Sequence, residues 1–250
     1  MATDYEVPAI RRAHQILETL ATKGTPVSAA DLGLATGLPK STLYLLLESL
    51  VQRRWIEKRS DGYLIGIGLY TLGASYLRHD ALQEAFRHAA VEFVEREKEV
   101  LQLAVLDGDE VVYIAREDAP RPVRLVSELG SRLPAHACAL GKALLAQLPE
   151  AKLQQLLPAR LPAITEHTVT DLAQLLEQLR EVRRSGVATE QEEVTAGLCC
   201  FAAYVGQTPS GKSIAVSTSI PVARLDAQRR SDIRGEIADV AAQMKKAIVG

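Results

Sequence analysis

Hydrophobic residues in the first third of the chain recur at helical spacing and are separated by short turn signals. They predict a first helix over residues 9–21, with an apolar face of isoleucine, alanine and leucine. Ser28 and Asp31 have capping-box spacing and predict the start of a second helix, which Gly37 ends. Pro39 opens a third helix with leucines at helical spacing. Two short helices joined by a glycine-containing turn are typical of a helix-turn-helix.

The pattern changes after this helical segment. Residues 55–66, WIEKRSDGYLIG, predict two strands around a Ser-Asp-Gly turn, which is the wing of a winged helix. Residues 68–98 have a helical pattern, and part of that stretch is expected to link the two halves of an α+β chain. The later elements predicted are a hairpin around Asp107 and Gly108, helices over 136–148 and 170–183, two strands flanking residues 206–211, and an amphipathic helix from about Leu225.

A match to the phosphate-binding pattern G-x-x-x-x-G-K-[ST] lies at Gly206, Gly211, Lys212 and Ser213. A genuine phosphate loop needs a helix directly after it, because the helix N-terminus supplies amide donors to the phosphates. Here the residues that follow, IAVSTSIPVA, alternate with period two and predict a strand. We therefore interpret the match as the turn of a β-hairpin, and a nucleotide hydrolase is the less favoured reading.

Composition indicates a globular protein, with 47% hydrophobic and 24% charged residues and a formal net charge of −2. Residues 1–78 carry a net charge of +2 and the remainder −4, which fits a basic module joined to an acidic one. Three cysteines, two of them adjacent, form no disulfide framework and predict a reducing, cytoplasmic environment. No signal peptide, membrane span, cofactor or metal ion is expected, and no enzymatic activity.

The predicted third helix carries polar residues that core packing does not explain. In a helix-turn-helix, the N-terminal residues of the second helix enter the major groove, and basic wing residues straddle the neighbouring backbone. We expect double-stranded DNA to be contacted by Ser28, Lys40, Ser41, Thr42, Tyr44, Lys58 and Arg59. A winged helix that binds only protein is the alternative.

Three segments carry a resemblance that spans nearly the whole chain: GLPKSTLYLLLESL, GSRLPAHACALGKALLA and SGVATEQEEVTAGLCCFAAYV. Their order and spacing resemble the IclR family of bacterial transcriptional regulators. The resemblance implies a winged helix-turn-helix over 1–75, a linker helix over 76–90, and a GAF-like α/β effector-binding and oligomerisation domain with an antiparallel sheet over 91–250. It also implies homodimers that pair into tetramers on palindromic operators. Relatives usually carry arginine where this chain has Leu45.

The same resemblance implies an effector pocket between the sheet and the helix over 136–148. Its lining would be Leu125, Leu133, Ala139, Leu140, Glu190, Ala196, Cys200, Ser217 and Ser219. Period-two alternation independently places Ala215, Ser217 and Ser219 on one small, polar strand face. Helix-start amides near Ala139 could hold a carboxylate, and Glu190 would repel an anion unless protonated or bonded to a ligand hydroxyl. We expect an organic acid or aromatic effector, controlling a catabolic or metabolic operon.

Other polar residues receive structural interpretations. His136 and Cys138 lie near a helix start without a third ligand nearby, so a structural role is favoured over a metal or nucleophile site. Cys199 and Cys200 are expected on opposite faces of a strand. The EQEE run, residues 190–193, is interpreted as a solvated acidic turn apart from Glu190.

Overall fold

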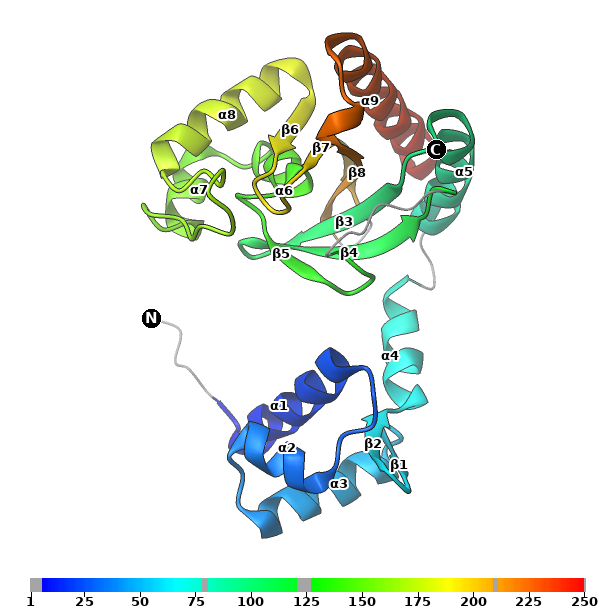
Figure 1. Ribbon diagram of the computed structural model, residues 1–250, viewed down its shortest axis with the longest axis vertical. Helices are drawn as coiled ribbons and strands as arrows, with labels where there is room; N and C mark the ends of the chain where they lie inside the picture. Colours follow the sequence, from blue (N-terminus) through cyan, green and yellow to red (C-terminus); the bar gives the residue numbers. More distant parts are fainter. Residues whose placement is uncertain (1–5, 78–80, 121–126, 209–210, 250) are drawn as a thin grey trace. The chain divides into compact units, whose positions relative to one another are not determined.

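The computed structural model describes residues 6–77, 81–120, 127–208 and 211–249. The chain divides into two compact units, Met1–His79 and Asp80–Gly250 (Figure 1). The break falls within the range predicted as a linker helix, but the helix that follows it packs into the second unit. No helix among the described residues is long and apolar enough to cross a bilayer.

The first unit is a helix-turn-helix with a hairpin wing. Its elements are α1 (Pro8–Lys23), α2 (Ala29–Thr36), α3 (Lys40–Gln52), β1 (Ile56–Arg59), β2 (Gly62–Ile65) and α4 (Ile67–Leu77). The predicted caps of α2 are present: the Ser28 hydroxyl accepts the Asp31 N–H at 3.1 Å, and Gly37 adopts φ 64°. Buried leucines and isoleucines from α1, α2, α3 and β1 form one small core. This packing leaves one face of α3 in solvent.

The wing is anchored to the body of the first unit by the first two residues of β2. β1 and β2 pair antiparallel, and Tyr63 exchanges backbone hydrogen bonds with Val27 at 2.9 and 3.0 Å. Gly62 has φ 149°, and a Cβ there would lie 2.6 Å from the carbonyl oxygen of Val27. Only glycine therefore lets the wing approach the α1–α2 connection this closely.

The second unit is built on a six-stranded antiparallel sheet in the order β5-β4-β3-β8-β7-β6. Its strands are β3 (Leu101–Asp107), β4 (Glu110–Glu117), β5 (Arg132–Pro134), β6 (Val187–Gln191), β7 (Leu198–Gln207) and β8 (Ser213–Pro221). Its helices are α5 (Ala81–Glu97), α6 (Ala139–Leu145), α7 (Glu150–Leu156), α8 (Leu172–Ser185), a 3-10 turn (Val222–Arg224) and α9 (Ala227–Val249). The predicted hairpin around Gly108 is confirmed as β3–β4. The α+β class is confirmed with it.

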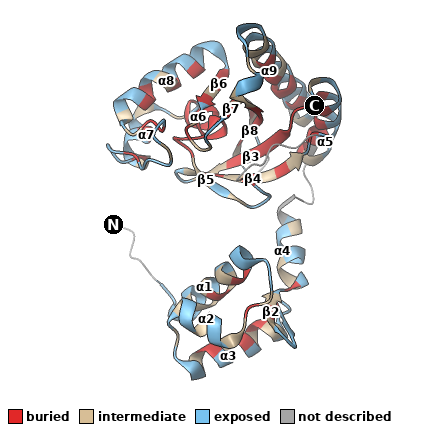
Figure 2. Ribbon diagram, viewed as in Figure 1, coloured by how far each residue is buried: buried red, intermediate tan, exposed pale blue. Residues whose placement is uncertain are grey.

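Two layers of helices cover the two faces of this sheet (Figures 1 and 2). On one face, α5 and α9 bury Phe93 and Ile237 against the sheet. On the other, α6 and α8 pack against Ala104 and Ala202. Strand β8 contributes to both layers by alternation, as predicted: Ile214, Val216 and Ile220 lie with α5 and α9, and Ala215 lies with α6.

The phosphate-binding pattern lies in a hairpin. β7 and β8 pair antiparallel on either side of it, and Gln207 is opposite Ser213. The Lys212 ammonium is 3.1 Å from a carboxylate oxygen of Asp107. Because a strand follows the motif, no helix N-terminus is available to bind phosphate there.

Candidate functional site

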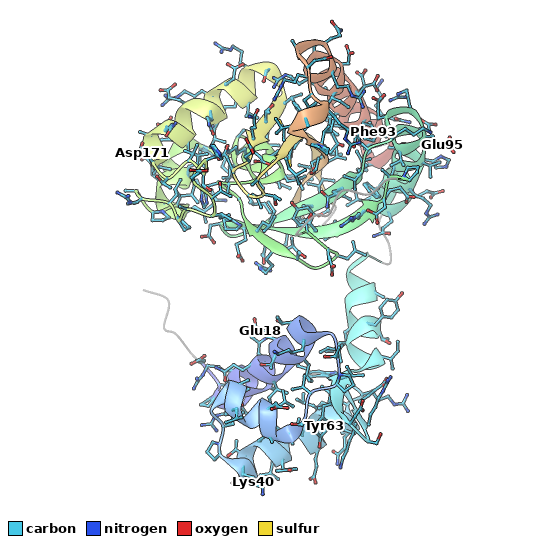
Figure 3. The ribbon with its side chains drawn as sticks, in the orientation of Figure 1. Glu18, Lys40, Tyr63, Phe93, Glu95 and Asp171 are labelled. Carbon is cyan, nitrogen blue, oxygen red and sulfur yellow. The ribbon has the colours of Figure 1, made fainter. Side chains whose placement is uncertain are left out.

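The outer face of α3 is the first candidate site. Leu43, Leu47 and Leu50 face the core, so the opposite stripe faces solvent. That stripe, which we call the reading face, consists of Ser41, Tyr44, Leu45 and Glu48 at i, i+3, i+4 and i+7. Lys40 at the start of the helix also projects into solvent (Figure 3).

The other residues predicted to face DNA have different settings. Thr42 is half-buried beside the core, and Ser28 is engaged as the cap of α2, where its hydroxyl also donates to the Asp31 carboxylate at 2.6 Å. Lys58 and Arg59 are exposed on β1, with an Arg59 nitrogen 3.6 Å from the Glu57 carboxylate. The structure thus brings Lys40, Ser41 and Tyr44 together at the start of α3 and places the two wing cations on β1.

A cavity in the second unit is the other candidate site. It has a volume of about 30 Å³ and lies between the sheet and the start of α6. This volume holds one or two water molecules. Its lining comes from five strands, the segment before β5, the β6–β7 turn and the α6 cap: Tyr113, Ser127, Leu133, Cys138, Glu190, Val194, Thr195, Leu198, Cys200 and Ser219.

Four residues implied by the family resemblance meet at this cavity: Leu133, Glu190, Cys200 and Ser219. Ala139 and Leu140 are buried in the first turn of α6, Ser217 is buried in β8, and Ala196 is exposed in the β6–β7 turn, all outside the cavity lining. Leu125 lies outside the described residues. The start of α6 is capped by the Cys138 sulfur, which accepts the Gly141 N–H at 3.3 Å.

Sequence reasoning missed six lining residues: Tyr113, Ser127, Cys138, Val194, Thr195 and Leu198. Tyr113 sits in a strand of bulky residues, and nothing in its neighbours distinguishes its inward direction from core packing. Ser127 is held by the Gln102 side chain at 2.8 Å.

Glu190 gives the cavity its electrostatic character. Only 2% of the residue is exposed, and this burial raises the pKa of its carboxyl to about 7. Hydrogen bonds from the Cys200 thiol and from the Glu193 N–H, the latter at 2.9 Å, oppose that rise. The site therefore holds a carboxyl group that titrates near neutral pH rather than in the usual acidic range.

The prediction that residues 191–193 form a solvated acidic turn is wrong for Glu193. Its carboxylate forms an ion pair with the Lys142 ammonium, and both residues are buried. The second carboxylate oxygen accepts the Val169 N–H at 3.3 Å, and the Thr168 hydroxyl donates to the Glu193 carbonyl at 2.7 Å. This network ties α6 to the β6–β7 turn, which supplies Val194 and Thr195 to the cavity.

Glu190 predicts a pH dependence of stability. Because its pKa is higher in the folded chain than in the unfolded chain, the folded state binds more protons between about pH 4.5 and 7. As the pH rises through that range, the free energy of unfolding of the wild type should fall by about 3 kcal/mol relative to that of Glu190→Gln. Above about pH 7 the difference between the two proteins should stay constant. Urea unfolding at a series of pH values measures this difference.

The matched control is Glu166→Gln, which changes a carboxyl group whose side chain is 89% exposed. Its pH profile should follow that of the wild type. Parallel profiles for the wild type and Glu190→Gln would contradict the assignment of a raised pKa to Glu190.

The remaining polar candidates have structural partners. The His136 ring nitrogen lies 2.9 Å from the Pro162 carbonyl oxygen. Cys199 and Cys200 point to opposite faces of β7, as predicted, one into each core. Within the described part of the chain, no group of three or more His, Cys, Asp or Glu side chains could hold a metal ion.

Both units match one family of proteins. Residues 9–60 match the IclR helix-turn-helix domain, and residues 74–246 match the C-terminal domain of the bacterial transcriptional regulator IclR. The chain therefore belongs to the IclR family of bacterial transcriptional regulators. The family's members are regulators rather than enzymes, in agreement with the hairpin found at the phosphate-binding pattern.

Individual relatives cover most of the chain. The regulator Rv1719 of Mycobacterium tuberculosis is 32% identical over 225 residues, covering 87% of this chain and 84% of the relative. The repressor AllR of Escherichia coli is 33% identical over 229 residues, covering 88% and 83%. An IclR homologue from Microbacterium hydrocarbonoxydans, solved in complex with 4-hydroxybenzoate, shares the fold with a TM-score of 0.84 and 24% identity, covering 96% of this chain and 99% of that one. An IclR regulator from Alicyclobacillus acidocaldarius gives a TM-score of 0.83 at 22% identity, covering 97% and 99%.

Proposed function

We propose that this protein acts in the cytoplasm as an effector-responsive regulator of a catabolic or metabolic operon and binds a palindromic operator as a dimer or tetramer. The observation that carries the proposal is the reading face of α3, which lies outside the core of the first unit and begins at Ser41, next to the exposed Lys40. The first residues of such a helix enter the major groove. Lys58 and Arg59 on the wing add positive charge for the phosphate backbone.

The cavity supports a compact effector that carries a hydroxyl group. Ser127, Ser219 and the Glu190 carboxyl offer hydrogen bonds, while Leu133 and Leu198 offer apolar contact. A ligand hydroxyl can donate to Glu190, whereas a ligand carboxylate is tolerated beside Glu190 only in its protonated form. The 4-hydroxybenzoate bound by the Microbacterium protein combines a hydroxyl with an acid group.

The size of the cavity predicts how such an effector enters. A volume of about 30 Å³ is too small for an organic acid of more than a few non-hydrogen atoms. The effector must therefore displace part of the lining, and the β6–β7 turn carries two of the lining residues. If the widened form differs from the closed form in operator affinity, linkage requires DNA to change effector affinity by the same factor.

The DNA-binding part of the proposal is tested by selecting fragmented genomic DNA on the purified full-length protein and titrating salt on the recovered sites. We expect a recurring palindromic site whose affinity falls steeply with salt, because bound lysines and arginines release counterions from the phosphates. Lys40→Ala should reduce the slope of log affinity against log salt by about one for each binding unit.

Lys23→Ala is the matched control, since Lys23 is an exposed lysine at the end of α1 and is not a residue of the reading face. Its salt slope should equal that of the wild type. Failure to enrich any site, with and without cell extract as a source of effector, would refute DNA binding and favour a protein-binding scaffold.

A further inference from the structure

The centre of the reading face is apolar. Leu45 is 69% exposed, and its neighbour Tyr44 is 42% exposed. Ser41, four residues before Leu45, and Glu48, three residues after it, bracket this apolar centre with polar groups on the same helix face. An exposed leucine alone needs no explanation, but this one occupies the surface that the helix-turn-helix turns toward base edges.

Only one base offers an apolar group in the major groove. Thymine carries a C5-methyl, whereas guanine, adenine and cytosine present hydrogen-bonding atoms at their exposed edges. A leucine side chain has no donor or acceptor, so packing it on guanine or cytosine would desolvate polar atoms without pairing them. Packing on a thymine methyl instead removes apolar surface from water on both sides of the contact.

The charged residues around the reading face are also consistent with DNA as its partner. Lys40, Arg53, Lys58 and Arg59 are exposed on α3 and the segment that follows it. These cations match phosphates and carry no sequence information, so discrimination between bases must come from the reading face. The acceptor-only carboxylate of Glu48 would repel a phosphate, so this part of α3 offers no phosphate contact.

We propose that Leu45 is a specificity-determining residue that reads the C5-methyl group of a thymine in each half-site of the operator. This inference rests on the proposed function, namely that the chain binds DNA through α3. It assigns to Leu45 an apolar readout in place of the hydrogen-bonding one that an arginine would perform.

The test begins with the operator recovered from genomic DNA. A series of copies is synthesised, and in each copy one thymine position is replaced by deoxyuridine in both half-sites. This replacement removes the methyl group and leaves base pairing intact. At one position we expect the wild-type protein to lose about fourfold in affinity per half-site, the value of one buried methyl. Leu45→Ala should bind with nearly equal affinity to the thymine and deoxyuridine operators at that position.

Two variants serve as controls. Leu34→Ala removes the same atoms from an exposed leucine, 84% accessible, on α2 rather than on the reading face, and should keep the fourfold loss. Leu45→Met keeps an apolar side chain at this position and should retain most of the fourfold loss of affinity. Circular dichroism of each variant confirms folding, which is expected because neither leucine is part of the core.

The outcomes separate this inference from the proposed function. DNA binding without a methyl effect at any thymine, or an effect unchanged by Leu45→Ala, would overturn the role of Leu45 alone. Absence of any specific, salt-dependent DNA binding by the wild-type protein would overturn both the proposed function and this inference.

Discussion

Replacing Lys142 with methionine is expected to lower the free energy of unfolding of the second unit by about 3–5 kcal/mol. The substitution leaves the Glu193 carboxylate buried without its counter-charge, at 5% exposure of the residue. Urea unfolding followed by circular dichroism measures the loss. The single tryptophan, Trp55, lies in the first unit, so its fluorescence should report an unchanged transition there.

Two further variants show whether the buried charge is the cause. Lys142→Met combined with Glu193→Gln removes both charges and keeps a carbonyl acceptor for the Val169 N–H, so it should recover more than half of the lost stability. Lys152→Met changes an exposed lysine of α7 and should stay within about 0.5 kcal/mol of the wild type. A Lys142→Met protein as stable as the wild type would argue against the ion pair as a structural element.

The second large effect is expected from Gly141→Ala. A Cβ at Gly141 would overlap the backbone carbonyl and Cα of Ala135, so α6 could not lie against that segment. Overpacking of this kind costs about 3 kcal/mol or more when backbone atoms must move. Thermal unfolding should show a lowered midpoint for the second unit. Residues at the start of α6 would shift with it, including Cys138 at the cavity.

Gly235→Ala provides the matched control, because Gly235 is an exposed helical glycine of α9 with open space where its Cβ would lie. In a helix interior this change stabilises by about 0.5–1 kcal/mol, since alanine has less backbone freedom to lose. A loss of stability in Gly141→Ala together with a gain in Gly235→Ala would support close packing at Gly141. Equal effects would contradict it.

Much of the fold could be predicted because its signals are local. The cap at Ser28, the stop at Gly37 and the leucine spacing of α3 each depend on residues within two helical turns. The alternation in β8 separates a small face from a bulky face within the strand's own sequence, and the structure shows that the two faces meet different helix layers. Strand β6, with the sequence VATEQ, was missed because it lacks clear alternation, and its ends are defined only by pairing with β7.

The candidate cavity could be predicted only in part, because its residues come from segments that are far apart in the sequence. The family resemblance implied Leu133, Glu190, Cys200 and Ser219, and the β8 alternation independently supported Ser219. The buried ion pair could not be predicted, because Lys142 and Glu193 are 51 residues apart and each reads as a surface charge in its own segment. Only the packing of α6 over the β6–β7 turn shows that the two charges neutralise each other.

The strand order has a consequence for synthesis of the protein on the ribosome. β8 is the last strand to emerge, yet it lies at the centre of the sheet between β3 and β7. Until it emerges, the β3–β4 hairpin and the β6–β7 hairpin have no strand to join them, and the cavity lacks Ser219. The segment that forms the helix-turn-helix unit has left the ribosome long before. A nascent chain thus gains its helix-turn-helix unit first and the complete cavity of its second unit only near the end of translation.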